Sequence, residues 1–301
     1  MTCLHRGRRL LQTLALSLLL VLSPMLGCGT PTSVSTPPAA TTPVVSSTPA
    51  GTEAATAESN GAKVTNFTDV QSASGNWEQF LQVQPTYVDC SDPACALTLG
   101  LNIMTGPIGD PSMDGKTEEF ELDPVKPWVD TLSVAQLVGT QNRKNLDVSH
   151  TVLPNVHNIQ YDVYFWVDKS IWIYSTQALE FDISLWIPAA GQTWGTQCSK
   201  EDGNFDYWQN VPGKWNSTGI PCKPILGGWN HLTWYFTRAE DNSLQYNSLI
   251  FNGTKYPLNI HDAPTKTPAG WYGLAANVQL DSNVLGHQVY IYVDKMTISY
   301  W

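Results

Sequence analysis

Short runs of alternating apolar and polar residues recur along the chain from about residue 62 to the C-terminus. Each run is rich in β-branched and aromatic residues and is bounded by Gly, Pro, Asn or Asp, the pattern of β-strands. The runs are Phe80–Val83, Tyr161–Val167, Ile171–Tyr174, Leu179–Ile187, His231–Phe236, Leu249–Phe251 and Val289–Val293. So many short strands without helical crossovers predict an all-β fold, a two-sheet antiparallel jelly-roll β-sandwich.

Two local signals add detail to this fold. The dipeptide Asn252-Gly253 lies between Leu249–Phe251 and Lys255–Leu258, which predicts a hairpin with a two-residue turn. One short helix of one or two turns is expected over Leu132–Val138.

The strand predicted over Leu179–Ile187 carries two carboxylates in an otherwise apolar run. Because strand side chains alternate between faces, Phe181, Ile183 and Leu185 are expected to enter a core. The opposite face would carry Glu180, Asp182, Ser184 and Trp186. Residues 161–168 show the same alternation, with Asp162, Tyr164 and Trp166 on the polar face. If both strands lay in one sheet with these faces aligned, they would form the wall of a groove.

The first 27 residues predict an export signal. Basic residues 5–9 precede an apolar run over residues 10–22, which is too short to remain as a membrane span. Met25-Leu26-Gly27-Cys28 then resembles the lipobox of bacterial lipoproteins, which implies that Cys28 becomes a lipidated N-terminus. An ordinary secretory signal cut nearby is the alternative. The chain is therefore expected in the bacterial cell envelope, outside the cytoplasm in the periplasm or at the cell surface, with a lipid as its contact with the membrane.

Composition separates a tether from a folded domain. Residues 28–61 are nearly all Thr, Pro, Ser, Ala and Val, and such a segment is predicted to be a disordered tether. Residues 62–301 are expected to form one β-sandwich domain. Loss of three arginines with the signal changes the formal net charge from −10 to −13, which argues against a nucleic acid partner. Polarity comes largely from amides, hydroxyls and aromatic rings, since only 14% of residues are charged.

Four cysteines remain after the signal is removed and Cys28 is lipidated. In an oxidising compartment they predict two disulfides, and three pairings are open. The local pairing joins Cys90 to Cys95 and Cys198 to Cys222. A metal site is the rival interpretation, but the spacing does not match that of zinc fingers.

Several segments together resemble the concanavalin A-like lectin and glucanase superfamily. They are Ala178–Ile183, Trp194–Cys198, Gly228–Leu232 and Val289–Ile298. The resemblance implies a jelly-roll sandwich. In its laminarinase-like hydrolases, one strand carries Glu-x-Asp-x-Glu as nucleophile, helper and acid/base. It would place Glu180 as nucleophile and Asp182 as helper, but Ser184 stands at the acid/base position and cannot protonate a leaving glycosidic oxygen.

A second group of candidates lies in and around the loop from Cys198 to Cys222. Flat aromatic rings stack on the apolar faces of sugar rings, and nearby polar side chains bind the hydroxyls. The stacking candidates are Trp194, Trp208 and Trp215, with Gln197 and His231 as polar candidates. No cofactor is expected from the sequence. The resemblance leaves a calcium ion open, held by Asp and backbone oxygens, although no dense Asp-x-Asp-x-Asp loop is present.

Three functions remain open from the sequence. The first is a surface-tethered, lectin-like lipoprotein that binds a polysaccharide, oligosaccharide or cell-wall glycan. The second is a glycoside hydrolase that uses Glu180 as nucleophile or base with an acid from another strand. The third is a structural envelope protein whose sandwich binds another protein.

Overall fold

A computed structural model describes residues 63–72, 77–83, 86–89, 102–123, 127–140 and 153–301. The chain divides into two units, Met1–Ala50 and Gly51–Trp301, and every described residue belongs to the second. The predicted export signal, the lipidation of Cys28, the tether and the Cys90–Cys95 pair therefore lie outside the described residues.

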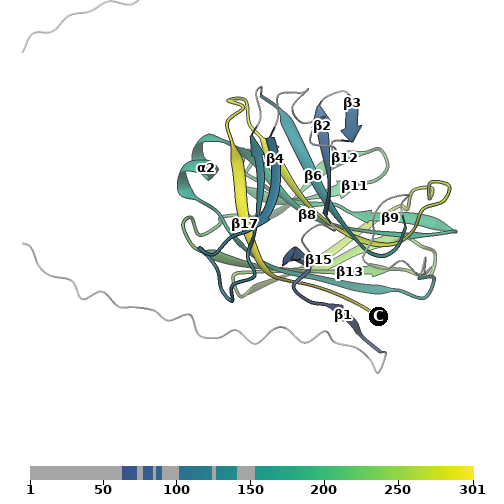
Figure 1. Cartoon of the computed structure of the whole chain (residues 1–301). Coiled ribbons are helices and arrows are strands. Elements are labelled where there is room, and N and C mark those ends of the chain that lie inside the picture. Colours follow the sequence, from purple (N-terminus) through teal and green to yellow (C-terminus); the bar gives the residue numbers. More distant parts are fainter. Residues whose placement is uncertain (1–62, 73–76, 84–85, 90–101, 124–126, 141–152) are drawn as a thin grey trace, which may run out of the picture. The chain divides into compact units, whose positions relative to one another are not determined.

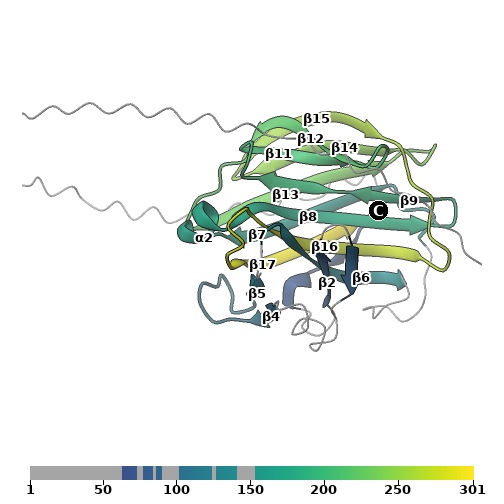
Figure 2. The same cartoon turned by 90° about the horizontal axis from the view of Figure 1, so that it is seen from above.

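Strands make up nearly all regular structure of the described residues (Figures 1 and 2). The strands are β1 (Thr65–Phe67), β2 (Trp77–Val83), β3 (Thr86–Asp89), β4 (Asn102–Pro107), β5 (Glu118–Asp123), β6 (Val129–Thr140), β7 (Asn158–Trp166), β8 (Thr176–Ile187), β9 (Ala190–Trp194), β10 (Thr196–Ser199), β11 (Asn204–Gln209), β12 (Lys214–Pro221), β13 (Trp229–Arg238), β14 (Leu244–Phe251), β15 (Thr254–Asp262), β16 (Tyr272–Ser282) and β17 (Val289–Tyr300). The helices are the 3₁₀ turn η1 (Val70–Ser72) and the α-helix α2 (Lys169–Tyr174).

The strands form two sheets, named A and B below. Sheet A has the order β15-β14-β13-β7-β17-β5-β4, with β1 also paired to β17. Sheet B has the order β12-β11-β10-β8-β16-β6-β2-β3, with β9 also paired to β8. The strand pairs are antiparallel in both sheets. The predicted all-β sandwich of two antiparallel sheets is confirmed.

The main core lies between the two sheets. Apolar side chains of β7 and β13 in sheet A and of β8 and β16 in sheet B belong to one buried cluster. Phe181, Ile183 and Leu185 of β8 are at most 1% exposed, which confirms the alternation predicted for this strand. The opposite face of β8 therefore points away from the core.

Two predictions of local structure were wrong. Residues 171–174 were expected to be a strand, but they belong to helix α2, where only Ile171 is buried. Asp168 caps this helix by accepting hydrogen bonds from the backbone N–H groups of Ser170 (2.7 Å) and Ile171 (3.3 Å). Residues 132–138 were expected to be a short helix, but they lie within β6, which pairs with β16 on one side and β2 on the other. Pairing on both sides gives β6 more backbone hydrogen bonds than an isolated turn of helix could.

The predicted hairpin is confirmed. β14 and β15 pair across Asn252-Gly253, with φ values of 47° and 82° that suit a two-residue turn.

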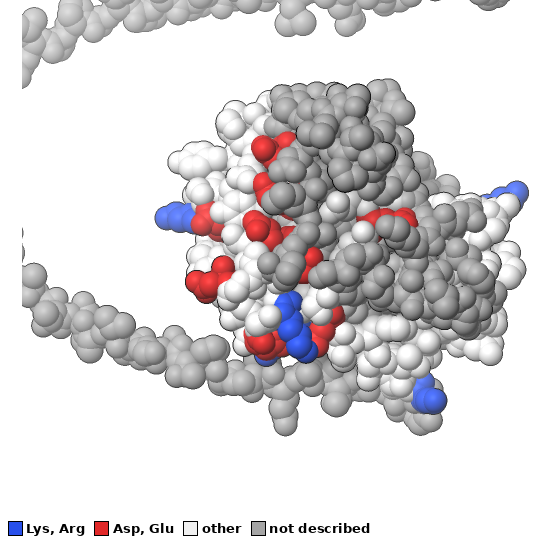
Figure 3. All heavy atoms as spheres, in the orientation of Figure 1, with Lys and Arg blue, Asp and Glu red and all other residues white. Residues whose placement is uncertain are grey.

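The surface charge also follows the composition: Figure 3 shows acidic side chains gathered on the face in view, with Lys and Arg standing singly around them. In the described part of the chain, no helix has the length and apolarity needed to cross a membrane.

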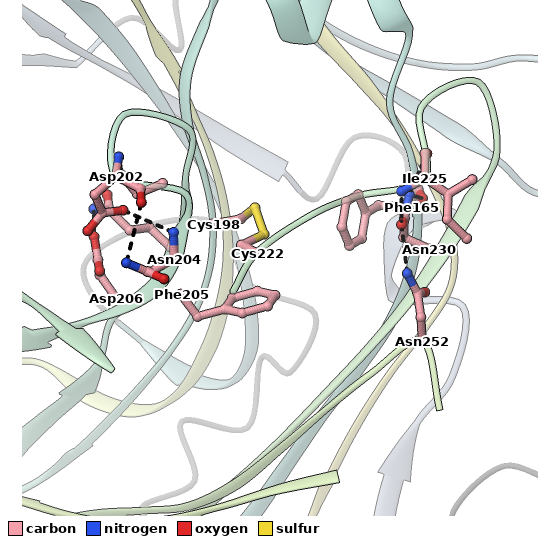
Figure 4. The surroundings of a disulfide bond; sticks show 12 residues. Phe165, Cys198, Asp202, Asn204, Phe205, Asp206, Cys222, Ile225, Asn230 and Asn252 are labelled. Carbon is pink, nitrogen blue, oxygen red and sulfur yellow. Dashed lines mark hydrogen bonds between the residues drawn. A yellow bond between two sulfur atoms is a disulfide. The ribbon is translucent and has the colours of Figure 1, made fainter. Parts of the chain in front are cut away.

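The predicted disulfide between Cys198 and Cys222 is present, with a Cα–Cα distance of 5.6 Å. It links β10 to the end of β12, and Phe205 lies beside it (Figure 4). Figure 4 also shows Asn230 of the Gly-Trp-Asn-His segment, whose Oδ1 accepts hydrogen bonds from Ile225 N (2.7 Å) and Asn252 Nδ2 (3.0 Å). Asn230 is fully buried, so this segment fixes a loop and the hairpin turn.

Loss of the Cys198–Cys222 bond should destabilise the domain. The two cysteines are 24 residues apart, and closing a loop of this length lowers the entropy of the unfolded chain. We expect the Cys198→Ala/Cys222→Ala variant to lose about 3 kcal/mol of unfolding free energy in a denaturant titration. An unchanged unfolding midpoint would contradict this expectation.

Candidate functional site

A cavity of about 450 Å³ opens on the outer face of sheet B, over β8. Glu180 and Asp182 line it, as their place on the polar face of the strand requires. Its other lining residues are Asp130, Gln177, Thr193, Gly195, Gln197, Trp208, Trp215, Gln279 and Asp281. The candidate site is therefore an acidic hollow with amide side chains and two tryptophans around it.

Carboxyl groups from three neighbouring strands meet in this cavity. β16 pairs with β8 so that Gln279 lies opposite Glu180, and two residues further along it Asp281 lies opposite Asp130 of β6. Glu180 and Asp281 are joined by a side-chain hydrogen bond. Gln279 Nε2 also donates to Asp281 Oδ1 at 3.0 Å. A second carboxyl group thus stands directly against Glu180, from a strand about a hundred residues away in sequence.

Burial sets the protonation of this pair. Desolvation, followed by the charges of Asp281 and Asp182, raises the pKa of Glu180 well above its usual range. Burial also raises the pKa of Asp281, to about 6, although the hydrogen bonds from Glu180 and Gln279 oppose that shift. The pair therefore keeps a proton at a pH where a free carboxyl group has lost it. The two groups titrate as a unit.

The other two carboxyl groups are also shifted toward the protonated form. Burial raises the pKa of Asp182 to about 8, with a smaller contribution from Asp281, against a hydrogen bond that lowers it. That bond runs from the Thr196 N–H to Asp182 Oδ1 at 2.7 Å. Burial and the charge of Asp281 raise the pKa of Asp130 to about 8. Near neutral pH the cavity is a partly protonated acid cluster.

Two tryptophans form one wall of the cavity. Trp208 and Trp215 face each other across the β11–β12 pair, with ring centroids 5.3 Å apart and an interplanar angle of 69°. Gly195 lets Trp208 pack closely against the chain beside β10. A Cβ atom at residue 195 would lie only 2.6 Å from the Trp208 Cβ. The Cys198–Cys222 bond ties the same pair of strands to β10. Both rings are half-buried, so each keeps some surface for a ligand.

A second cavity of about 280 Å³ adjoins the first and shares Asp182, Thr193 and Gln279 with it. Its remaining lining residues are Phe80, Leu132, Val134, Ser184, Trp186, Trp271 and Asn277. Trp186 and Trp271 meet edge to face, with centroids 5.2 Å apart. We call the two cavities together the groove. Each cavity has a tryptophan pair in its lining, and the four carboxyl groups line the first cavity, which shares Asp182 with the second.

The expectation that β7 and β8 form one groove wall was wrong. β7 belongs to sheet A and β8 to sheet B, so their polar faces point outward on opposite sides of the core. Asp162, Tyr164, Trp166 and His231 lie on the outer face of sheet A, away from the groove. There His231 Nε2 and Asp162 Oδ2 are 2.9 Å apart, and the Tyr164 ring stacks on His231 at 4.1 Å.

Trp194 also does not reach the groove. It is fully buried in the main core and stacks on Phe236, with ring centroids 5.7 Å apart. By contrast, Gln197 lines the groove and donates through Nε2 to Asp206 Oδ2 at 2.7 Å. Ser184 lies on the floor of the second cavity and contacts Thr193 Oγ1 at 3.3 Å.

Sequence reasoning missed several groove residues, namely Asp130, Gln279, Asp281, Asn277 and Trp271. Asp281 was noticeable only as an acid on a late strand. Asp130 precedes a segment that the sequence analysis took for a helix. Their place in the groove depends on the pairing of β6, β16 and β8, which no local pattern encodes.

The described residues include no group of three or more His, Cys, Asp or Glu side chains arranged to hold a metal ion. A calcium ion remains an expectation from the sequence resemblance.

No known protein family matches the sequence. No curated protein matches it either. Among solved structures, the chain is similar to arcelin-5, a lectin-like defense protein from Phaseolus vulgaris, at 10% identity and a TM-score of 0.42, covering 80% of this chain and 99% of that one. An alginate lyase from Chlorella virus matches at 11% identity and a TM-score of 0.39, covering 70% and 98%.

A structure of carbohydrate-binding modules from the β-sandwich superfamily matches at 8% identity and a TM-score of 0.36. That match covers 75% of this chain and 58% of the length of the other. Lectins are thus among the similar structures. Similarity at this level carries no information about a ligand.

The buried acid cluster should make stability fall as pH rises. A carboxyl group whose pKa is higher in the folded than in the unfolded state binds more protons when folded, so unfolding free energy falls between about pH 4 and pH 8. Asp182→Asn removes one such group and keeps an acceptor for the Thr196 N–H. We expect this variant to be more stable than the parent at pH 8 by about 1 kcal/mol or more, and to show a shallower pH dependence.

Thermal or denaturant unfolding at a series of pH values measures this effect. The control is Glu240→Gln, since the Glu240 side chain is 96% exposed. Equal pH profiles for Asp182→Asn and the parent would contradict the assignment of a buried, protonated cluster.

Proposed function

We propose that this protein binds a carbohydrate chain in the groove of sheet B. The observation that carries the proposal is the lining of the two adjoining cavities, which combines buried carboxyl and amide side chains with a tryptophan pair in each. Sugar rings present apolar C–H faces and a rim of hydroxyls, and they need both kinds of surface at once.

The groove is also suited to bind without large rearrangement. Its floor residues stand on β8 and β16, which are paired on both sides within sheet B. The strands carrying Trp208 and Trp215 are fixed by the disulfide. A preformed site loses less conformational entropy when a ligand binds, which favours affinity.

Charge narrows the class of carbohydrate. Among the described residues that line the groove, four are Asp or Glu and none is Lys, Arg or His. A uronic acid polymer would therefore meet repulsion unless a cation bridged it. The proposed ligand is a polysaccharide, oligosaccharide or cell-wall glycan without acidic sugars.

We further propose that the domain acts outside the cytoplasm. The sequence predicts a lipid on Cys28 and a tether over residues 28–61, which together would hold the groove at a distance from an envelope membrane. Lipid anchoring, the tether and the location in the bacterial envelope remain predictions from the sequence.

Removal of one ring should weaken glycan binding. We expect Trp208→Ala to raise the Kd for a bound oligosaccharide about tenfold, since a stacked aromatic ring contributes on the order of 1 kcal/mol. A glycan array identifies the ligand, and calorimetry measures the Kd. Tyr174→Ala on helix α2 is the control, because Tyr174 is 61% exposed and does not line the groove. An equal loss in both variants, or none in either, would contradict a site at Trp208.

A second candidate is hydrolysis of the bound chain. The contact between Glu180 and Asp281 favours it, because it supplies an acid from another strand next to Glu180. However, glycosidases hold their two carboxyl groups about 5 to 9 Å apart to admit the substrate oxygen or water. A directly hydrogen-bonded pair is closer than that, which favours binding over hydrolysis.

An assay for released reducing ends on any glycan that binds separates these candidates. We expect no release by the parent protein. Release that is abolished in Glu180→Gln but retained in Glu240→Gln would establish the hydrolase and overturn the binding-only proposal. Absence of glycan retention together with a stable protein partner would favour a structural envelope role.

A further inference from the structure

Two of the amide side chains that line the groove already use their donors within the protein. The side-chain amides of Gln197 and Gln279 each donate to a carboxylate of the protein, Asp206 and Asp281 respectively. These amide N–H groups are therefore committed within the protein. What the floor offers to a ligand is mainly carboxyl oxygen.

Asn277 is an unpaired polar side chain beside the acid cluster. It lies on β16 opposite Asp182, lines the second cavity and is 7% exposed. Its Oδ1 atom is buried and has no hydrogen-bond donor within the protein. An unpaired amide side chain in the lining of the cavity is costly, and a polar group of a ligand would lower that cost.

Charge then favours one type of donor. Asp130, Glu180, Asp182 and Asp281 converge on the floor from three strands, and no described lining residue is cationic. A ligand cation placed there would favour the ionised form of each neighbouring carboxyl group and would pair with it once its proton has left. A hydroxyl group would make hydrogen bonds there without stabilising that charge.

We propose that the groove selects glycans that carry free, protonated amino groups, that is, polymers of deacetylated amino sugars. The inference rests on the proposed carbohydrate-binding function and deepens it. Tryptophan rings bind the faces of the sugar rings, and the acid cluster binds the ammonium group. An N-acetylated sugar has the same ring but lacks the charge, so it loses the stronger, charge-assisted hydrogen bonds.

This mode of binding has a proton signature. Near pH 6 an amino sugar is charged, whereas burial holds Asp130, Glu180 and Asp182 largely protonated. An ammonium group lowers the pKa of neighbouring carboxyl groups, so its binding should release protons to the buffer. The groups facing the site are Asp130 of β6, Glu180 and Asp182 of β8, Asp281 of β16 and, beyond Gln197, Asp206 of β11.

The test is calorimetric titration of the full chain at about pH 6 with a glucosamine hexamer and with its N-acetylated counterpart. Each titration is run in two buffers of different ionisation enthalpy, which reports the protons released. We expect the amine form to bind at least about tenfold more tightly, equal to about 1.4 kcal/mol, and to release protons, while the acetylated form releases none.

Variants test the acid cluster and the Trp208 ring separately. Asp281→Asn and Asp130→Asn, each checked for folding by its melting curve, should reduce the preference for the amine toward parity. Trp208→Ala should weaken both ligands by a similar factor and leave their ratio unchanged. Glu240→Gln should change neither the affinity for the two hexamers nor their ratio, since the Glu240 side chain is far more exposed than the groove acids.

Three results would overturn the inference. Equal affinity for both hexamers without proton release would leave carbohydrate binding intact but remove the amino-sugar specificity. Equally tight binding of spermidine, unaffected by Trp208→Ala, would show that the site recognises amines rather than sugars. Failure of both hexamers and of all other glycans to bind would refute the proposed function itself.

Discussion

The two faces of β8 are the constraint on which the groove depends. This strand is hydrogen-bonded on both sides, to β16 on one and to β9 and β10 on the other, so its side chains can only point inward or outward. Phe181, Ile183 and Leu185 enter the core, and this fixes the register. A slip by one residue would put Glu180 and Asp182 between the sheets, at a prohibitive desolvation cost. The apolar face therefore determines where the acids stand.

Much of the fold could be predicted because its signals are local. Strand alternation, the Asn252-Gly253 turn and the face of β8 all follow from residues close in sequence. The errors came from competing local signals. The apolar run at 171–174 looks like a strand, but capping by Asp168 favours a helix. The segment 132–138 has no partner in its own sequence neighbourhood, and its strand forms only because β2 and β16 lie beside it.

The site was harder to predict than the fold, because it depends on which strands become neighbours. The polar face of β7 resembles that of β8 in composition, yet the two strands lie in different sheets. Asp281 reaches Glu180 through the β8–β16 pairing, across about a hundred residues of sequence. The sequence makes Trp194 and Trp208 equally good candidates for stacking on a sugar ring, but only Trp208 lies on the outer side of sheet B. Alternation gives the face of a strand but not its neighbours.

The two cavities share Asp182, Thr193 and Gln279, so they meet over one stretch of floor. A ligand that fills both must pass over this floor, with one part against Trp208 and Trp215 and another against Trp186 and Trp271. The two contacts then act as linked sites on one molecule, and the second benefits from a high effective concentration once the first has formed. A fragment long enough for one tryptophan pair gains nothing from the other. A ligand long enough to reach both tryptophan pairs should therefore bind more tightly than one that reaches a single pair.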